Sequence, residues 1–402
     1  MMTSSDRAPT SGRILAINGG SSSVKLAMYS YETLRRELQG RIEGIGSGKT
    51  ALVVERAGDA KPERIAIDGA DSERLPENLA AWLEEQSVLH DLSGVGHRIV
   101  HGGVRLVEHQ RITPALVQTL KDSVALDPAH LPREIGLIEA IAQTAPRVPQ
   151  VACFDTEFHR DLPRVAQLLP IPREYLDAGI RRLGFHGLSY TYLLGELRRV
   201  AGDRAADGRV ILAHLGSGAS LAALRGGRPI DTTMAFTPAA GLVMGTRPGD
   251  LDPGLLVYLM RAEHASADRL DFLINRECGL RGVSGTTSDM QGLLAKRDSD
   301  PRAGEAVELF CYQTVKWIGA FTAALGGLDT LVFSGGIGER SAVIRREICS
   351  RLQSLNAALD DSSNEAHAAV ISNGRSDIVV RVMPTDEEIV IARTVRKILE
   401  EP

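Results

Sequence analysis

The sequence predicts an α/β protein of two domains that arose by an internal duplication. The chain has 402 residues, which is too long for one compact core. A strand, a turn of small residues and a second strand are expected over 13–30 and again over 209–225. The two segments share Ile-Leu-Ala, then a glycine and a serine at equivalent positions, so each half would offer one hairpin to a cleft. Two unrelated hairpins of similar composition are the alternative.

The other elements follow from hydrophobic periodicity and from turn residues along the chain. Short polar strands are expected over 31–75, a helix over 76–90, a strand from Val95, two helices within 112–145, a strand over 149–155, a helix after Tyr190, helices over 254–275 and 303–325, a strand over 331–334, loop and helix over 353–375, a strand over 379–383 and a last helix beginning within 384–388. Strands and helices alternate along much of the chain, as expected for an α/β fold.

The composition is that of an ordinary globular protein, with 43% hydrophobic residues, 24% charged residues and a net charge of −5. This charge argues against nucleic acid or an anionic membrane as a partner. No apolar run reaches the ~20 residues of a membrane-spanning helix. Residues 1–12 are polar, unlike a signal peptide, and are expected to be a frayed leader. The four scattered cysteines are expected to be reduced thiols of a cytosolic protein, neither disulfides nor zinc ligands.

Turns of small residues predict contacts with phosphate. Residues 214–220, His-Leu-Gly-Ser-Gly-Ala-Ser, have little bulk and little charge. Glycines let main-chain N–H groups approach an anion closely, although many such turns only reverse the chain. Lys25, after the first turn, either reaches a phosphate or is simply solvated. A third candidate is 331–339, where a strand runs into a glycine turn and a helix.

Charged side chains stand beside apolar segments at several places. Arg98, within an apolar strand, is either an ion-pair partner or a group for a carboxylate or phosphate. Asp155 ends a strand, where α/β folds place chemistry, or caps the next helix. His186 lies between glycines, in a cleft or as a cap, and Arg247 ends an apolar loop as a buried charge. The acidic residues 386–388 suit a helix N-terminus and could also hold Mg²⁺.

From about residue 13 to 397 the chain resembles the acetate kinase family, within the acetate and sugar kinase/Hsp70/actin superfamily. The motifs are Asn-x-Gly-Ser-Ser-Ser-x-Lys (18–25), Gly-His-Arg-x-Val-His-Gly-Gly (96–103), Phe-Asp-Thr-x-Phe-His (154–159), Gly-Phe-His-Gly (184–187), His-Leu-Gly-x-Gly-Ala-Ser (214–220), Phe-Thr-Pro (236–238), Met-Gly-Thr-Arg-x-Gly-Asp (244–250), Gly-Gly-Ile-Gly-Glu (335–339) and Pro-Thr-x-Glu-Glu (384–388). The resemblance implies two ribonuclease H-like (actin-like ATPase) domains around a nucleotide cleft, residues 1–155 plus 388–402 and residues 156–387.

The resemblance also implies a reaction, the reversible, ATP-dependent phosphorylation of acetate or propionate to an acyl phosphate. Such a transfer depends mainly on in-line positioning and on neutralising charge. In the family pattern Arg98 and Arg247 flank the acceptor carboxylate and the moving phosphoryl group. Asp155 is then the catalytic acid, and His186 stabilises the equatorial oxygens. Family members are typically homodimers, and a cytoplasmic location is expected.

Further site residues follow from the same resemblance. Asn18 and Glu387 match the positions that order Mg²⁺ (or Mn²⁺). The ATP positions are Ser21, Ser23 and Lys25 in the first turn, His214, Gly216, Ser217 and Gly218 in the second, and Asp289, Gly335, Gly336 and Ile337 on the adenosine side. The acceptor pocket is Val100, Leu126, Phe185 and Pro238. This small apolar pocket suits a methyl or ethyl tail and distinguishes one methylene by only ~1–3 kcal/mol.

Some positions depart from the family pattern, and they leave the nucleotide, the rate and the acceptor open. They are Ser217 and Asp386 in place of Asn, Leu188 and Tyr190 in place of Thr and His, Gln291 in place of a basic residue, Ala240 in place of Glu, and Leu131 in place of Asn. A divergent nucleotide-binding homologue with weak or altered acceptor activity is therefore the alternative. The retained buried charges favour an active kinase, since a dead site needs none. A sugar kinase is a weaker option, because two arginines suit a carboxylate better than a hydroxyl.

Overall fold

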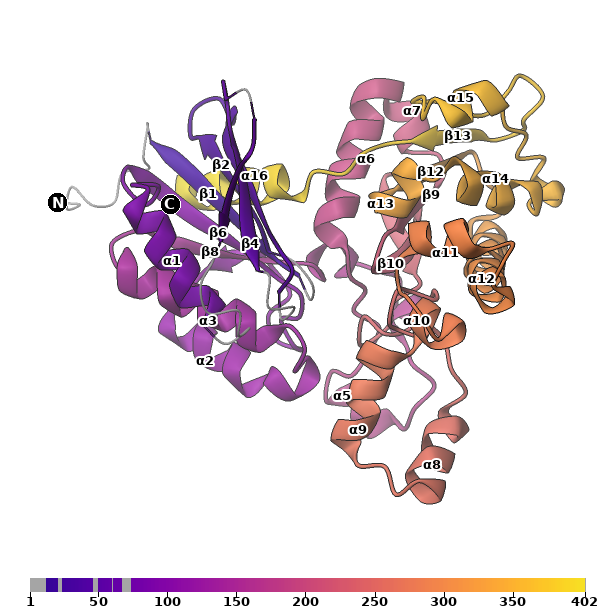
Figure 1. Ribbon diagram of the computed structural model, residues 1–402, viewed down its shortest axis with the longest axis horizontal. Helices are drawn as coiled ribbons and strands as arrows, with labels where there is room; N and C mark the ends of the chain where they lie inside the picture. The colour runs from indigo at the N-terminus through magenta and orange to yellow at the C-terminus, as the bar shows by residue number, and fades with distance from the viewer. Residues whose placement is uncertain (1–11, 21–23, 46–49, 60, 67–73, 402) are drawn as a thin grey trace. The chain divides into compact units, whose positions relative to one another are not determined.

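The computed structural model describes residues 12–20, 24–45, 50–59, 61–66 and 74–401. The chain divides into two compact units. Unit 1 comprises residues 1–157 and 386–402, and unit 2 comprises residues 158–385. Each unit is built of helices and one sheet (Figure 1).

The sheet of unit 1 has the strand order β5-β4-β3-β2-β1-β6-β8-β7. The strands are β1 (Arg13–Gly19), β2 (Val24–Ser30), β3 (Arg36–Glu43), β4 (Ala51–Arg56), β5 (Glu63–Ala66), β6 (Leu92–Ile99), β7 (Gln110–Arg111) and β8 (Gln150–Phe154). Each pair of neighbouring strands from β1 to β5 is antiparallel, whereas β6 runs parallel to both β1 and β8. This parallel centre brings the carboxyl ends of β1, β6 and β8 to one edge of the sheet.

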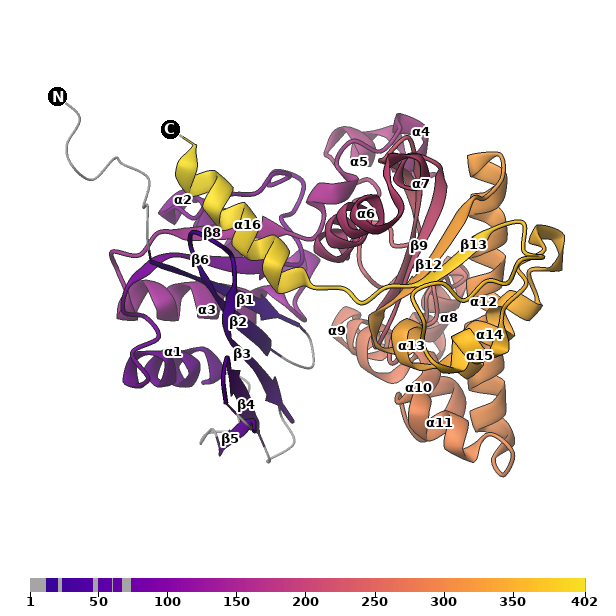
Figure 2. The same ribbon diagram turned by 90° about the horizontal axis from the view of Figure 1, so that it is seen from above.

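Helices cover both faces of this sheet (Figure 2). They are α1 (Leu75–Glu85), α2 (Pro114–Asp122), the 3₁₀ turn η1 (Val124–Leu126), α3 (Leu131–Thr144) and α16 (Glu387–Glu400). Leu15 and Ile17 of β1 pack in one core with residues of α1 and α3. On the other face α16 lies against β1, β6 and β8. Gly96 permits this approach, because a Cβ there would lie 2.3 Å from Ile391 Cγ2.

The sheet of unit 2 repeats the centre of the first. Its order is β11-β10-β9-β12-β13, with β9 (Arg209–Leu215), β10 (Ala219–Arg225), β11 (Arg228–Thr232), β12 (Thr330–Ser334) and β13 (Val379–Val382). The first three strands are antiparallel, and β9, β12 and β13 are parallel. Strands β3-β2-β1-β6-β8 of unit 1 have the same order and directions. The predicted duplication and the ribonuclease H-like fold class are thereby confirmed.

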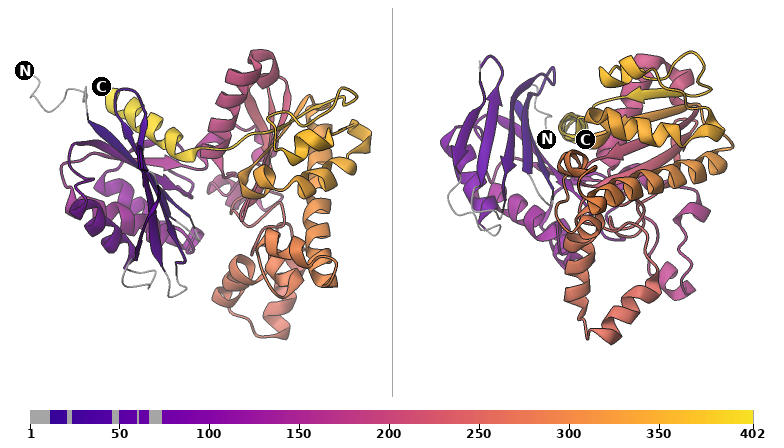
Figure 3. Two further views of the ribbon diagram at one scale, coloured as in Figure 1. Left: turned by 45° about the horizontal axis from the view of Figure 1, so that its top comes forward. Right: turned by 45° about the vertical axis from the view of Figure 1, so that its right-hand side comes forward.

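The helical elements of the second half include α6 on one face of its sheet and α12 on the other (Figures 1 and 3). They are η2 (Glu157–His159), α4 (Arg164–Gln167), α5 (Arg173–Asp177), α6 (Gly187–Ala201), α7 (Asp203–Ala206), α8 (Pro253–Ala262), α9 (Ala267–Phe272), the π-helical turn η3 (Leu273–Glu277), α10 (Gly279–Ser284), α11 (Met290–Lys296), α12 (Pro301–Leu325), α13 (Gly335–Arg340), α14 (Ala342–Ser350), η4 (Gln353–Leu355) and α15 (Asp361–Glu365). Tyr190, Leu193 and Leu197 of α6 pack in one core with Leu212 of β9 and Val332 of β12.

One expected helix, over 254–275, is wrong. Helix α8 ends at Ala262, and α9 starts after Ser266, whose side chain caps it by accepting a hydrogen bond from the Arg269 N–H. His264 adopts a left-handed backbone conformation with φ 53° between them. No Gly or Pro marks this break, so hydrophobic periodicity alone predicted one continuous helix.

The cysteines and the length of the helices were also predicted from the sequence. All four cysteines are free thiols, as predicted. Burial raises the pKa of Cys311 and of Cys349 to about 12, so both thiols stay protonated near neutrality. None of the helices in the described part of the chain has the length and apolar character needed to cross a membrane.

Candidate active site

Arg98 and Asp155 form a buried ion pair at the carboxyl ends of two parallel strands. Arg98 lies on β6, and Asp155 directly follows β8. The Arg98 Nε and Nη2 atoms donate to Asp155 Oδ2 over 3.1 and 2.5 Å. Their side chains are 13% and 1% exposed. Burial by itself would lower the pKa of Arg98, but the carboxylates of Asp155 and Glu387 outweigh it and raise that pKa, so the guanidinium stays charged.

The pair decides between the alternatives that the sequence left open for Asp155. Its carboxylate bonds to Arg98 and caps no helix, so the interpretation as an N-cap is wrong. Its second oxygen, Oδ1, is buried and has no hydrogen-bond partner among the described residues. A buried acceptor left unsatisfied costs about 1–3 kcal/mol. Such an atom is a natural contact for a proton, a cation or a ligand.

Asn18, at the end of β1, joins this ion pair to the start of α16. Arg98 Nη1 donates to Asn18 Oδ1 over 3.2 Å. Asn18 Nδ2 donates to Glu387 Oε2 and to Glu388 Oε1, each over 2.8 Å. Burial raises the pKa of Glu388, and the charge of Lys25 opposes this rise. The first turn of α16 thus presents two adjacent carboxylates in contact with the amide of β1.

These two carboxylates suit a divalent cation whose remaining ligands are phosphate oxygens of a substrate and water. No cluster of three or more His, Cys, Asp or Glu side chains that could hold a metal occurs in the described segments. Mg²⁺ is usually held by one or two carboxylates together with substrate phosphates and water, and it prefers oxygen ligands. Glu387 and Glu388 supply such oxygens, and Asn18 fixes their side chains.

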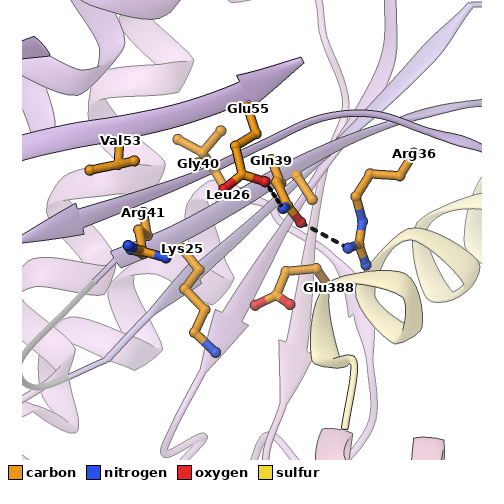
Figure 4. A pocket seen from close by; sticks show the side chains of 10 residues that line it. Lys25, Leu26, Arg36, Gln39, Gly40, Arg41, Val53, Glu55 and Glu388 are labelled. Atoms are coloured by element: carbon orange, nitrogen blue, oxygen red, sulfur yellow. Dashed lines mark hydrogen bonds between the residues drawn. The ribbon is translucent and has the colours of Figure 1, made fainter. Parts of the chain in front are cut away.

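Lys25 lines a pocket on the face of the unit 1 sheet, with a volume of about 220 Å³. The pocket lies over β2, β3 and β4, and its wall also includes Glu388 (Figure 4). The lining residues are Lys25, Leu26, Ala27, Arg36, Gln39, Gly40, Arg41, Val53, Glu55 and Glu388. Lys25 is exposed, and its ammonium end points toward Glu388 (Figure 4). Ser21 and Ser23, the other candidates from the first turn, lie outside the described residues.

Arg36 is a residue that the sequence reasoning missed. Its Nη2 donates to Asp386, and its Nε donates to the Tyr29 hydroxyl over 3.2 Å. Asp386 also caps α16 by accepting from the Ile389 N–H over 3.1 Å. The extra negative charge of Asp386, where the family pattern has Asn, was the available signal that a cation stands opposite. The pair ties the beginning of α16 to β3.

The pocket residues predicted for the acceptor tail divide between the units. In unit 1 Val100 is buried and Leu126 is half-buried. The Val100 N–H donates to both oxygens of Glu134, each over 3.2 Å. Burial, followed by the charge of Asp127, raises the pKa of Glu134 well above its usual range. In unit 2 Phe185 and Pro238 are both buried.

His186 precedes α6, with φ 58° and no capping hydrogen bond from its side chain. The interpretation as a capping histidine is therefore wrong. Its Nδ1 lies 2.9 Å from Ser220 Oγ. Its ring stacks on that of His214, with 4.3 Å between ring centroids. The His186 imidazole thus contacts both His214 and Ser220, the two ends of the second predicted phosphate turn.

Arg247 and His186 meet at the glycine turn between β9 and β10. A Cβ on Gly218 would lie 2.6 Å from Arg247 Nη2 and 3.3 Å from His186 Nε2. Arg247 Nη1 donates to the Pro238 carbonyl over 2.7 Å. Arg247 is half-buried, not fully buried as expected. A cation and an imidazole beside bare backbone form an arrangement suited to a phosphoryl group.

The turn is shorter than the sequence suggested, because β9 extends to Leu215 and β10 begins at Ala219. Gly216 and Gly336 approach each other, since a Cβ on Gly216 would lie 3.8 Å from the Gly336 N atom. The second and third glycine segments therefore come together, with Gly335, Gly336 and Ile337 opening α13 directly after β12. The Ser217 carbonyl accepts from the Gly245 N–H over 2.9 Å.

Two other predicted ATP residues have local partners. Asp289 caps α11 by accepting from the Gly292 N–H over 2.8 Å. His214 Nδ1 lies 2.9 Å from Ser189 Oγ, a residue of α6. The first contact fixes a helix end, and the second orients the ring that stacks on His186.

Comparison with known proteins gives a consistent result. The Acetokinase family model matches residues 13–393. An acetate kinase of Rhodopseudomonas palustris is 42% identical over 393 residues, 96% of this chain and 98% of that protein. An acetate kinase of Rhizobium meliloti is 40% identical over 396 residues, covering 97% and 99%. Among solved structures, a propionate kinase from Francisella tularensis superposes with a TM-score of 0.87 at 33% identity, over 95% of this chain and 98% of that one. An acetate kinase from Porphyromonas gingivalis gives 0.83 at 33% identity, over 96% and 100%.

Proposed function

Since the chain belongs to the acetokinase family, we propose that it is an acetate or propionate kinase. It transfers the γ-phosphoryl group of ATP to the carboxylate and forms an acyl phosphate and ADP, reversibly. The observation that carries the proposal is the Arg98–Asp155 pair, with its one unsatisfied carboxylate oxygen. A charged pair at the carboxyl ends of parallel strands is where an α/β fold places chemistry.

In unit 1, Arg98 would bind the acceptor carboxylate, because a guanidinium offers parallel donors that match carboxylate oxygens. Asp155 keeps Arg98 oriented through Oδ2. Its Oδ1 is the position at which Asp155 would hold the proton of a catalytic acid. The family resemblance assigns Val100, Leu126, Phe185 and Pro238 to the short apolar tail.

In unit 2, His186 and Arg247 would stabilise the transferring phosphoryl group. Charge in this transition state is spread over three equatorial oxygens, so donors aimed at those oxygens accelerate the reaction. The Nε2 atom of His186 and the Nη2 atom of Arg247 both border Gly218. The absence of a side chain at Gly218 lets both groups approach the backbone of this turn closely.

ATP would be held by the glycine turns and by a divalent cation. We assign Lys25, with Ser21 and Ser23, to the first turn, His214, Gly216, Ser217 and Gly218 to the second, and Asp289, Gly335, Gly336 and Ile337 to the adenosine side. Glu387 with Asn18, next to Glu388, would hold the cation, Mg²⁺ or Mn²⁺. When bound, such an ion neutralises charge on the phosphate oxygens.

Two further parts of the proposal rest on the family resemblance alone, namely a homodimeric assembly and a cytoplasmic location. Light scattering of the purified protein at several concentrations measures the first. A mass of one chain at all concentrations would remove it.

The experiment that tests the reaction traps the acyl phosphate as its hydroxamate. ATP and either Mg²⁺ or Mn²⁺ are supplied with acetate, propionate or butyrate. Product with the two shorter acids is expected. Arg247→Ala should lower kcat/KM by about 100-fold or more, as expected for loss of a donor to the transition state. The matched control is Arg228→Ala, which removes an exposed arginine of β11.

The opposite result is equally informative. If the protein binds ATP by calorimetry but forms no hydroxamate with any acid, the kinase assignment is wrong. The divergent nucleotide-binding homologue would then be the better description.

A further inference from the structure

Tyr190, a buried residue of α6, is linked to His186 through one serine. The Tyr190 hydroxyl lies 2.5 Å from Ser220 Oγ, and Ser220 Oγ lies 2.9 Å from His186 Nδ1. Tyr190 and Ser220 are fully buried, and His186 is 9% exposed. The Tyr190 N–H donates to the His186 carbonyl over 3.0 Å, which places Tyr190 one turn beyond His186. The three groups form a continuous chain of hydrogen bonds inside unit 2.

The single proton of the serine hydroxyl gives this chain a direction. A phenol is a stronger acid than an aliphatic alcohol, so Tyr190 is the better donor of the pair. When Tyr190 donates to Ser220 Oγ, the serine proton is left to donate to His186 Nδ1. Nδ1 is then an acceptor, and a neutral imidazole carries its proton on Nε2.

The Nε2 atom is the one that borders the glycine turn. A Cβ on Gly218 would lie 3.3 Å from it, and Arg247 Nη2 borders the same position. We propose that Tyr190, acting through Ser220, is a positioning residue that fixes His186 as the Nε2–H tautomer and directs this hydrogen to the Gly218 turn. The inference rests on the proposed function, which places the phosphoryl oxygens at this turn. Tyr190 itself need not touch the substrate.

Aromatic rings of neighbouring residues pack around this relay. His214 stacks on His186 and has its own partner, Ser189 Oγ. The ring of His159 packs against Tyr190 with 5.7 Å between centroids. Burial lowers the pKa of His159 to about 4, so this neighbour is neutral near pH 7. Arg247 is then the charged side chain beside the imidazole.

The test combines nitrogen NMR of the free enzyme with kinetics. With ¹⁵N-labelled histidine, the two ring nitrogens report the tautomer of His186, which is assigned by comparison with His186→Gln. Wild-type protein should show the Nε2–H form. Tyr190→Phe keeps the ring in the core but removes the hydroxyl group, so His186 should become a mixture of tautomers.

In the kinase assay, Tyr190→Phe should lower kcat about tenfold, as for the loss of one orienting hydrogen bond. KM for ATP and for the acid should stay unchanged, which a general loss of structure would not give. Ser220→Ala should give the same loss, and the double variant should lose no more than Ser220→Ala alone. The matched control is Tyr192→Phe, which removes a phenol hydroxyl from the same helix but from a different side.

A wild-type His186 protonated on Nδ1 would overturn the inference. So would a Tyr190→Phe protein that keeps one Nε2–H tautomer and an unchanged kcat. A wild-type protein that forms no acyl phosphate would refute the proposed function instead, and the NMR measurement would still decide whether Tyr190 fixes the tautomer.

Discussion

Removing one partner of the Arg98–Asp155 pair should destabilise unit 1 strongly, whereas replacing both should not. In Arg98→Met, the Asp155 carboxyl group, 1% exposed and with one oxygen already lacking a partner, would lose the guanidinium that it is paired with. Leaving a buried charge unpaired costs about 3–5 kcal/mol. In Asp155→Leu, the buried guanidinium of Arg98 would lose its carboxylate partner in the same way. The double variant Arg98→Met/Asp155→Leu replaces the pair by apolar side chains and should unfold within about 2 kcal/mol of wild type.

Urea unfolding followed by tryptophan fluorescence can measure this in one unit. The chain has two tryptophans. Trp82 is 8% exposed and belongs to the core of unit 1, and Trp317 lies on α12 of unit 2. In a Trp317→Phe background the signal therefore reports the unfolding of unit 1. The free energies of the four proteins complete a double-mutant cycle.

The cycle separates stability from function. A coupling of several kcal/mol between the two substitutions is expected, while the double variant should remain inactive in the hydroxamate assay. If the two single losses simply add in the double variant, the reasoning is refuted, because the charges would not depend on each other. If Arg98→Met unfolds like wild type, the cost assigned to the unpaired carboxylate is wrong.

Three further predictions concern other contacts. Arg36→Gln should lower the free energy of unfolding by only about 0.5–1 kcal/mol, because the side chains of Arg36 and Asp386 are 36% and 24% exposed. A double-mutant cycle with Asp386→Asn, followed by urea unfolding, should give a coupling energy of the same size. Arg345 is fully buried and donates to Asn364, His367 and main-chain carbonyls, so Arg345→Met should cost about 3 kcal/mol or more in the same assay. Burial lowers the pKa of His97 and of His159 to about 4. The unfolded chain therefore binds more protons than the folded one between about pH 6.5 and 4. The free energy of unfolding should fall with acidification over this range, by up to about 1.4 kcal/mol per pH unit for each histidine. Urea unfolding of His97→Gln across this range should show a shallower slope, and an unchanged slope would contradict the assignment.

The fold was predictable where the local pattern determines the structure. Apolar runs on both sides of small-residue turns marked the hairpins of β1–β2 and β9–β10, and their similarity marked the duplication. The end of α8 was not predictable, because no Gly or Pro breaks the apolar spacing there. That break depends on the cap supplied by Ser266 and on the backbone of His264, neither of which leaves a signal in hydrophobicity.

The candidate site was predictable as a set of residues but not as a set of contacts. Arg98 drew attention because a charge within an apolar strand needs a partner. The identity of that partner required the register of β6 and β8, since Asp155 lies 57 residues away. Arg36 was missed for the same reason, since Asp386 lies 350 residues further along the chain. Arg345 was missed because it belongs to the charged run Arg345-Arg346-Glu347 of α14, which reads as a solvated segment, and no motif includes it.

The departures from the family pattern bear on whether the kinase is active. Asp386 adds a charge, and Arg36 is its partner. Tyr190 stands where the family pattern has His, and its hydroxyl contacts Ser220, which in turn contacts His186. Gln291 is exposed, and nothing in the described contacts explains it. Two of the departures, Asp386 and Tyr190, are thus each matched by a polar partner. A site under no constraint would lose a buried contact such as that of Tyr190 with Ser220 readily, because an unsatisfied buried polar group is costly. The pairing therefore favours a working kinase over a homologue that only binds a nucleotide.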